Sequence, residues 1–375
     1  MKRILVWDVP TRVFHWTLAA CFALAWLTSE SDVWLSHHVF LGYAMLGLVG
    51  FRVVWGFVGG IYARFGSFAF GPREGLAYLR QVLAGRAARH IGHNPVGSQA
   101  IYLLLVLVLL VGVSGVFTLG GEEQHGVAAG WMGFDAGRVF KKLHEASAIF
   151  MLLLVAGHVA GVLLESLLHK ENLARSMVNG FKQASDATPA SRPYRVVAAL
   201  LVAALLGFGV WWFGYAPQQP RDVSKPVAFV GPALADNARW RDECGSCHLE
   251  FHPSLLPGRS WTQLLAQQNQ HFGVDLGLDG ATSAALLAYA LQNSAEKHAT
   301  EASYKIDASI PANVTPLRIT QTPYWVKKHR EIANADWDLP WIKSRTHCGA
   351  CHMDALAGTF EDAAMKIPRS APSAR

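Results

Sequence analysis

Five long apolar runs occupy the first 215 residues of the chain, and polar segments separate them. A helix needs roughly 20 apolar residues to cross about 30 Å of hydrocarbon. The runs therefore predict five membrane-spanning helices, at residues 13–28, 38–58, 98–119, 143–167 and 196–215. Beyond residue 215 the pattern changes to short mixed segments, which predict short helices separated by loops. We expect an all-α protein: a four-helix membrane bundle, a fifth spanning helix and a small, mostly helical domain.

The composition agrees with a chain that is partly in lipid. The sequence of 375 residues is 51% hydrophobic and 16% charged, whereas soluble domains average about 25% charged residues. Its net charge is +6, but the positive residues gather in loops beside the apolar runs, where membrane orientation explains them. We therefore expect a lipid bilayer as a partner and no nucleic acid.

The positions of lysine and arginine predict which side of the membrane each loop occupies. Five arginines lie between the second and third runs, five lysines or arginines lie between the fourth and fifth, and residues 29–36 have none. Arg138, Lys141 and Lys142 precede the fourth run and weaken this bias. Positively charged loops stay in the cytoplasm, so the N-terminus is expected there. An odd number of spans then puts everything after residue 215 in the periplasm.

The N-terminal segment has a second interpretation. The basic residues 2–3 and the stretch 18–21, which ends in a cysteine, have the outline of a lipoprotein signal. Asp8, Arg12 and His15 interrupt the part that should be purely apolar. We therefore expect a retained first helix.

Histidines lie inside the predicted spans, where polar groups are costly enough to need a reason. His144 and His158 are fourteen residues apart, which is about four turns or 21 Å of helix. One helix can therefore give one axial ligand to each of two stacked haems. Depth pairs His144 with His38 at a periplasmic-side haem b, and His158 with His15 at a cytoplasmic-side haem b. His37 competes with His38, and only one can ligate because adjacent helix residues point about 100° apart.

Two copies of Cys-x-x-Cys-His follow the spans, at residues 244–248 and 348–352. At this spacing two thiols bond covalently to a haem while the histidine binds its iron. We therefore expect two haem c groups with His248 and His352 as proximal ligands. The thiols that would attach them are those of Cys244, Cys247, Cys348 and Cys351. A four-cysteine zinc site is the alternative, but zinc does not need a histidine after each pair.

The distal ligands of these two haems must come from elsewhere in the chain. A neighbour in sequence cannot reach the opposite haem face, which excludes His252, His347 and Met353. His271 follows an apolar stretch that predicts a helix, and His329 shares a helical stripe with Trp325.

We expect His271 to serve the first c haem, by proximity in sequence, and His329 to serve the second. Met365 is the alternative for the second haem and would raise its potential. His298 lies in a polar stretch and is expected to be a solvated surface residue.

With these residues in place, the membrane region resembles the bacterial cytochrome b561 family, which includes the b-type subunit of nickel hydrogenases. The resemblance covers about residues 5–183. It is carried by Arg12-Val-Phe-His-Trp16, His38-Val-Phe-Leu-Gly-Tyr43, Arg52-Val-Val-Trp-Gly56, Leu143-His-Glu145, Gly157-His158 and the stretch 171–180. It implies two b haems in a four-helix bundle that exchanges electrons with quinones. It also implies that the ligand is the histidine four residues before Gly42, which is His38.

Residues 235–365 resemble the small dihaem cytochrome c family. The resemblance is carried by the first Cys-x-x-Cys-His with residues 253–257, and by Ser260-Trp261, His271-Phe-Gly273, Leu317-Arg-Ile-Thr320 and His329-Arg-Glu331. It implies two histidine ligands on each haem. Some proteins of that family partner an oxygen-binding monohaem cytochrome c.

Three regions are therefore predicted. Residues 1–183 form a b-type cytochrome membrane domain, residues 184–234 contain the fifth span and a proline-rich linker at 216–226, and residues 235–375 form a periplasmic dihaem cytochrome c domain. Arg52, in the second span, is either a contact for a haem propionate or an anchor that snorkels to the membrane surface.

The predicted protein is a tetrahaem electron-transfer cytochrome of the bacterial inner membrane. It would pass electrons from membrane quinol through two b haems to two c haems, and on to a soluble periplasmic cytochrome c or another redox partner. No residue predicts a general base, a nucleophile or an open metal site, so we expect no catalytic residues and no chemistry beyond quinol oxidation. The alternatives are oxidation of superoxide, or another small reductant, at the b haems, and service as an anchor and electron-transfer subunit for a partner redox enzyme.

Overall fold

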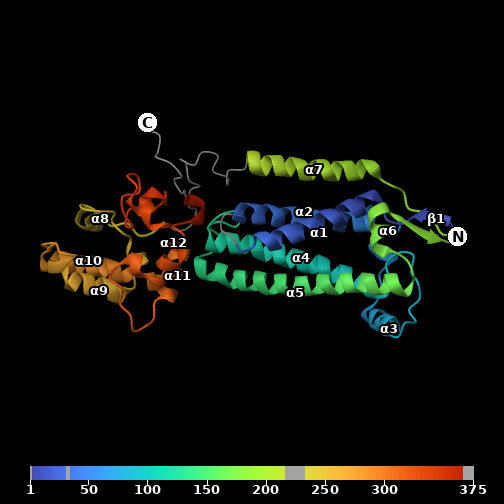
Figure 1. The fold of residues 1–375 in the computed structure, drawn as a ribbon, viewed down its shortest axis with the longest axis horizontal. Coiled ribbons are helices and arrows are strands. Elements are labelled where there is room, and N and C mark those ends of the chain that lie inside the picture. Colours follow the sequence, from blue (N-terminus) through green and yellow to red (C-terminus); the bar gives the residue numbers. More distant parts are fainter. Residues whose placement is uncertain (1, 31–33, 216–232, 366–375) are drawn as a thin grey trace. The chain divides into compact units, whose positions relative to one another are not determined.

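The computed structural model describes residues 2–30, 34–215 and 233–365. These residues are mostly helical (Figure 1). They form two compact units, one from residues 2–30, 34–115 and 140–215 and the other from residues 116–139 and 233–365. The all-α expectation is confirmed. The predicted proline-rich linker at 216–226 lies outside the described residues.

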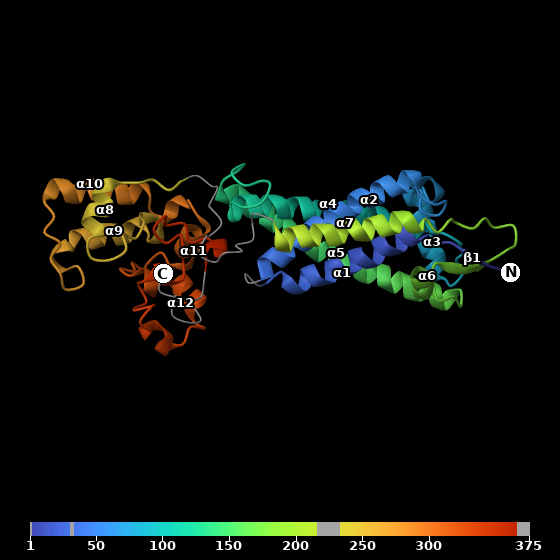
Figure 2. The same cartoon turned by 90° about the horizontal axis from the view of Figure 1, so that it is seen from above.

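The first unit is built around long helices that run side by side (Figures 1 and 2). They are α1 (Val9–Thr28), α2 (Leu35–Val58), α4 (Pro95–Glu122) and α5 (Phe134–Leu168). Four described helices are long and apolar enough to cross a membrane: α2, α4, α5 and α7 (Arg195–Gly214). The first predicted span corresponds to the helix α1, which is not among these four; it has 20 residues and packs against α2.

Local signals start the first helix, and packing then holds it. The Asp8 side chain accepts a hydrogen bond from the backbone N–H of Thr11 at 2.8 Å and so caps the free N-terminal turn. Pro10 follows in the first turn, where proline's missing N–H costs nothing. Phe14 and Cys21 then enter a buried cluster with residues of α2, α4 and α5. Cys21 is therefore part of the core of the bundle.

The helix α7 packs on the bundle through aromatic side chains. Phe208 stacks on Phe40 of α2 with ring centroids 5.1 Å apart. Trp212 lies 5.6 Å from the ring of Tyr43 and donates from Nε1 to the Ser36 hydroxyl at 3.3 Å. In lipid the hydrophobic effect does not drive helices together, so close packing of side chains such as these holds them.

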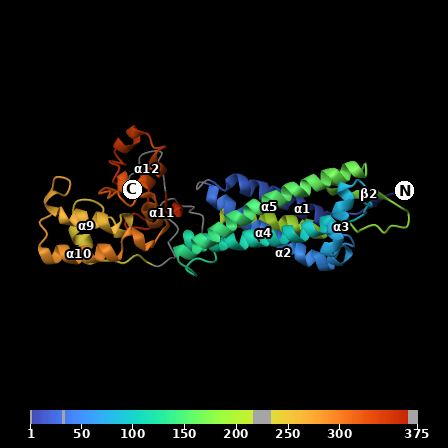
Figure 3. The same ribbon diagram turned by 90° about the horizontal axis from the view of Figure 1, so that it is seen from below.

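A small two-stranded sheet was not expected from the sequence. Strands β1 (Lys2–Leu5) and β2 (Phe181–Ala184) pair antiparallel, so that Leu5 lies opposite Phe181. Gly180 lies between the end of the helix α6 and the start of β2. Its φ is +88°, a conformation that costs glycine little. The sheet lies at the same end of the unit as α3 (Pro72–Leu83) and α6 (Leu173–Asn179) (Figures 1 and 3).

The second unit contains short helices around aromatic clusters, as the sequence predicts. They are α8 (Ala238–Cys244), α9 (Gly258–Ala266), α10 (Gly280–Gln292), α11 (Glu301–Ser309) and α12 (Pro323–His329). Trp240, Trp261 and Leu286 centre one buried cluster, and Trp325 and Trp337 centre another. Each cluster lies beside one of the Cys-x-x-Cys-His motifs, since Trp240 precedes Cys244 on α8 and Ala350 packs against the second cluster.

Candidate haem-binding sites

Two pairs of histidines face each other inside the membrane unit. The ring centroids of His15 on α1 and His158 on α5 are 6.4 Å apart. Those of His38 on α2 and His144 on α5 are 6.0 Å apart. The structure therefore brings together the same partners that helix depth predicts.

Two more pairs face each other in the second unit. The centroids of His248 and His271 are 6.3 Å apart, with ring planes 24° from parallel. Those of His329 and His352 are 6.2 Å apart. Each histidine that directly follows a Cys-x-x-Cys pair thus has one opposing imidazole from a distant part of the sequence.

The width of these gaps fits a metal with nitrogen on both sides. Metal–nitrogen bonds to imidazole are about 2 Å long, which places the two ring centroids roughly 6 Å apart. Direct hydrogen-bonded contact would bring the rings closer, and loose packing would not repeat one separation at four places. Iron with two axial histidines is the haem arrangement that leaves no open coordination position.

Backbone carbonyls orient several of these rings. The Nδ1 atoms of His38, His144 and His329 lie 2.9, 2.9 and 2.8 Å from the carbonyl oxygens of Ala25, Val111 and Trp325. A histidine that ligates a metal usually donates its second ring N–H in this way, which leaves Nε2 as the ligand. The donor pattern therefore fits axial ligation of haem iron.

The space around His144 depends on a glycine of α4. A Cβ atom built on Gly115 would lie 3.1 Å from both Nδ1 and Cε1 of His144. That distance is tighter than ordinary contact, so a larger residue would push the ring away. The ring of His144 is therefore held by a carbonyl and by the close approach of α4 together.

His37 and His38, the two candidates for one ligand position, face different neighbours. The ring of His37 lies 4.8 Å from that of Trp34 and 5.1 Å from that of Phe213 on α7. Only His38 faces His144. The 100° step between adjacent helix residues separates the two side chains.

His271 lies in a turn, whereas its sequence suggested a helix. The helix α9 ends at Ala266, a short 3₁₀ turn covers Gln268–Gln270, and His271 follows it. Phe272 and Gly273 have φ of +51° and +95°, so the chain reverses immediately after the histidine. The guanidinium of Arg318 covers the ring of Phe272 at 3.9 Å and fixes this turn.

Other candidate ligands are engaged elsewhere. Both ring nitrogens of His252 have partners, the Ser254 hydroxyl at 2.9 Å and the carbonyl of Ala235 at 3.3 Å. The Nδ1 atom of His347 lies 2.9 Å from the carbonyl of Ile342, as in the proposed ligands, but the imidazole that faces His329 is that of His352. Met365 pairs with His352 through its backbone, and its side chain is 39% exposed.

His298 is not simply a solvated residue, as its polar surroundings had suggested. Its Nε2 lies 3.0 Å from a carboxylate oxygen of Asp307, and its ring meets that of Tyr304 edge to face at 5.1 Å. The side chain is only 27% exposed. It belongs to a local polar contact on α11 and faces none of the predicted ligands.

The four cysteines of the motifs do not assemble a zinc site. In the part of the chain that the structure describes, none of them belongs to a group of three or more His, Cys, Asp or Glu ligand atoms within 4.8 Å of one another.

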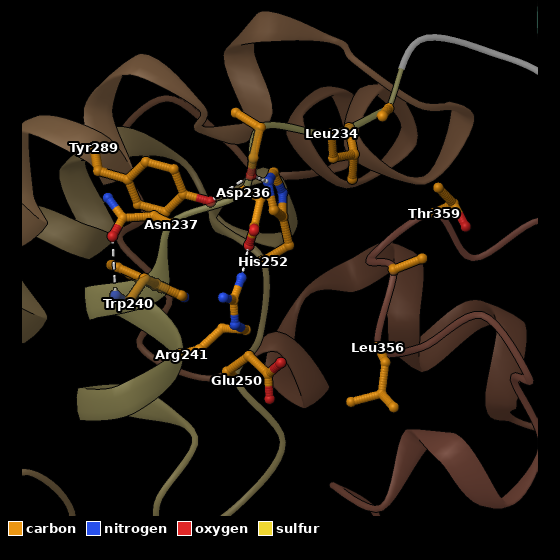
Figure 4. A pocket seen from close by; sticks show the side chains of 13 residues that line it. Leu234, Asp236, Asn237, Trp240, Arg241, Glu250, His252, Tyr289, Leu356 and Thr359 are labelled. Atoms are coloured by element: carbon orange, nitrogen blue, oxygen red, sulfur yellow. Dashed lines mark hydrogen bonds and ion pairs between the residues drawn. The ribbon is translucent and has the colours of Figure 1, made fainter.

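A cavity of about 480 Å³ lies beside both motifs (Figure 4). Trp240 and Glu250, which flank the first motif, line it together with Leu356 and Thr359, which follow the second. An ion pair between Asp236 and Arg241 and a hydrogen bond from the Tyr289 hydroxyl to the carbonyl of Ala235 at 2.6 Å border the cavity. The two motif segments therefore share one hollow of the second unit.

Two family models of known proteins match separate parts of the chain. The family model for prokaryotic cytochrome b561 matches residues 6–180, and that for dihaem cytochrome c matches residues 240–360. These limits confirm the resemblances predicted for residues 5–183 and 235–365.

The membrane region is similar to curated hydrogenase subunits. The probable Ni/Fe-hydrogenase 1 B-type cytochrome subunit of Escherichia coli (strain K12) is 22% identical over 216 residues, covering 47% of this chain and 89% of that protein. The corresponding probable subunit of Azotobacter vinelandii is 23% identical over 221 residues, covering 50% of this chain and 91% of that protein.

The second unit is similar to solved dihaem cytochromes. The diheme cytochrome c from Rhodobacter sphaeroides is 32% identical and is covered completely, over 34% of this chain, with a TM-score of 0.31. The diheme cytochrome from Shewanella baltica OS155 is 30% identical, with 94% of its chain and 36% of this chain covered and a TM-score of 0.29.

Family, helices and histidine pairs thus lead to one identification. The chain is a haem-binding membrane protein for electron transfer, in which residues 6–180 match prokaryotic cytochrome b561 and residues 240–360 match dihaem cytochrome c.

Proposed function

We propose that the protein oxidises membrane quinol and delivers the electrons to a soluble acceptor in the periplasm. The observation that carries this proposal is the set of four facing imidazole pairs, two in the membrane unit and two in the dihaem unit. Bound haem supplies one-electron redox chemistry, and two axial histidines favour electron transfer over binding of a substrate to iron.

The proposed cofactors are two b haems and two c haems. His15 with His158 and His38 with His144 would hold the b haems. His248 with His271 and His329 with His352 would ligate the c haems, which the four motif cysteines attach. This assignment uses every facing pair among the described residues once and leaves His37 and Met365 out.

The proposed orientation puts the dihaem unit in the periplasm of a bacterium, outside the inner membrane. Arginine-rich segments between α2 and α4 and after α5 would lie in the cytoplasm. Five crossings, those of α1, α2, α4, α5 and α7, then carry the chain to the outside. Electrons would leave through a c haem there, to a soluble cytochrome c or another redox protein.

The relatives favour a second candidate function. Proteins named as B-type cytochrome subunits of Ni/Fe-hydrogenase match most of their length to the membrane region. The chain would then serve as the membrane anchor and electron-transfer subunit of a partner redox enzyme. Stable co-purification of such an enzyme in stoichiometric amount would support this function, and a preparation free of any partner that still reduces a soluble acceptor would support the first.

An optical difference spectrum of the purified protein tests the proposed donor. We expect a quinol analogue to reduce both the b-type and the c-type absorption bands, with dithionite adding little. Reduction by dithionite alone would reject quinol as the electron donor. Inclusion of an oxidised periplasmic cytochrome c then shows whether the c bands reoxidise.

A further inference from the structure

Arg52 is a buried cation that the fold leaves without a carboxylate at ion-pair distance among the described residues. The residue is only 4% exposed, and its Nη1 atom has no hydrogen-bond partner. No carboxylate of the described residues forms an ion pair with it. A buried charge without a partner is strongly destabilising, and burial of the whole residue is inconsistent with an anchor that snorkels into water. The site is therefore missing an anion.

The groups closest to the Arg52 guanidinium are aromatic rings, which attract positive charge but carry no net negative charge. The guanidinium lies 4.7 Å from the ring centroid of Phe65 and 5.9 Å from that of Phe68, and both faces attract positive charge. Asp8 interacts with it electrostatically at longer range. The Asp8 carboxylate, however, already caps α1 and accepts from Nε1 of Trp55 at 3.3 Å.

Helix geometry places Arg52 at the level of His158. Arg52 follows His38 by fourteen residues on α2, and His158 follows His144 by fourteen on α5. Fourteen residues are about four turns, which returns a side chain to within roughly 40° of the same face. The rings of His38 and His144 face each other. Arg52 and His158 each lie fourteen residues further along their helices, so they are at the same level of the bundle.

A second unpartnered nitrogen accompanies the guanidinium. His93 packs between the rings of Phe68 at 4.2 Å and Trp7 at 4.7 Å, and its buried Nδ1 atom has no partner. It interacts electrostatically with both Arg52 and His158. An anion held by Arg52 would therefore lie beside the ligand pair of His15 and His158.

We propose that Arg52 and His93 bind a propionate carboxylate of the cytoplasmic-side haem b. A carboxylate supplies the missing charge, and its two oxygens match the forked donors of a guanidinium. A quinone carbonyl would accept a hydrogen bond but would leave the charge uncompensated. The inference rests on the proposed ligation of this haem by His15 and His158.

The positive charge has a consequence for electron transfer. A reduced haem carries one more negative charge than an oxidised one, so a nearby guanidinium in a low-dielectric bundle stabilises the reduced form. Arg52 would thus raise the midpoint potential of the cytoplasmic-side haem. Its removal should lower that potential and leave the periplasmic-side haem unchanged.

A redox titration of the full-length protein tests the proposal. In Arg52→Gln we expect one of the two b-haem transitions to fall by at least a tenfold change in its equilibrium, which is 59 mV for one electron. The same transition should be the one that His158→Ala abolishes. Arg52→Lys, which keeps the charge, should shift it less. Arg80→Gln, which removes an exposed cation from α3, is the matched control and should leave both transitions in place.

Infrared difference spectra identify the anion directly. Haem labelled with ¹³C at its propionate carboxylates should show redox-dependent carboxylate bands that move in Arg52→Gln and Arg52→Lys but not in Arg80→Gln. This readout remains available in Arg52→Lys if Arg52→Gln fails to retain haem. Unmoved label bands would overturn the proposal and point to a free anion or a quinone. The proposal would also be overturned if Arg52→Gln kept its full haem content and neither b-haem transition shifted. Mediated titration needs neither quinol nor an acceptor, so these outcomes are separate from a failure of the proposed electron route.

Discussion

At several of the paired histidines, a hydrogen bond to one ring nitrogen leaves the other nitrogen available to a metal. At His38, His144 and His329 a backbone carbonyl takes the Nδ1 hydrogen, and Nε2 is left for a metal. His252 shows the opposite situation, because both of its nitrogens are engaged. Local hydrogen bonding therefore argues against His252, but it does not identify the ligands by itself, because His347 makes the same carbonyl contact as His38.

Substitution of neighbouring histidines in α2 tests the b-haem ligands. We expect His38→Ala to lose half of the haem b, because the iron would keep only His144 on one side. His37→Ala should keep all of it, since that ring packs against Trp34 and Phe213. A pyridine haemochrome assay measures the ratio of haem b to haem c. Equal haem b in both variants would contradict the ligand assignment.

The second c haem offers a comparable choice between His329 and Met365. We expect His329→Ala to convert one of the two c haems from low spin to high spin, because one axial position opens. Met365→Ala should leave both haems low spin, since that side chain is 39% exposed. Electron paramagnetic resonance of the oxidised protein measures the spin states. Loss of low-spin signal in the methionine variant instead would assign Met365 as the ligand.

A buried carboxyl gives the dihaem unit a pH-dependent stability. Burial raises the pKa of Glu361 to about 9 from its ordinary value of 4.5, with help from Glu301 and two further acids. The folded protein therefore holds this proton more tightly than the unfolded chain, so stability is full below about pH 4.5 and falls as pH rises toward 9. We expect Glu361→Gln to be more stable than the parent at pH 8 and equal to it at pH 4.5.

Thermal unfolding of the full-length protein, followed through the c-type Soret band, measures this difference. Glu331→Gln is the control, because Glu331 is an exposed acid of the same unit. A parent protein whose stability does not change between pH 5 and 8 would reject the role of Glu361.

At the scale of helices, close approach and aromatic packing place the ligands. Gly115 lets α4 reach the ring of His144, and α7 packs on α1 and also on α2, where Phe208 and Trp212 meet Phe40 and Tyr43. The helix α7 therefore contributes to the bundle itself. Its apolar sequence predicts that it crosses the membrane but not which helices it touches.

Adjacent tryptophans of α7 test that packing. Trp212 is 4% exposed and Trp211 is 49% exposed. We expect Trp212→Ala to destabilise the membrane unit by up to about 3 kcal/mol, as for other buried aromatic residues. Trp211→Ala should have little effect. Thermal loss of the haem b Soret band in detergent measures both, and equal effects would show that α7 is not packed as described.

At the scale of the whole molecule, orientation in the membrane decides where electrons leave. Loop charge predicts a cytoplasmic N-terminus and a periplasmic dihaem unit. We expect alkaline phosphatase, which is active only in the periplasm, to be active when fused after residue 215. It should be inactive when fused in the arginine-rich segment 84–94. Activity in the second fusion would reverse the proposed orientation.

The sequence by itself determined the family, the apolar helices and the haem-attachment motifs. These depend on spacings within a few turns of chain: about 20 apolar residues for a span, fourteen residues between His144 and His158, and two residues between paired cysteines. Interactions along one helix or one loop are set by covalent geometry. They can therefore be predicted without knowledge of neighbouring elements.

Only the tertiary structure decided the features that depend on contacts between distant segments. It turned His37 toward α7 and His38 toward His144, placed His271 in a turn after α9, and packed α7 on the bundle. It also paired β1 with β2 and buried Arg52 without a carboxylate at ion-pair distance among the described residues. Periodicity fixes which residues share a helix face, but which neighbour that face meets depends on how the helices pack.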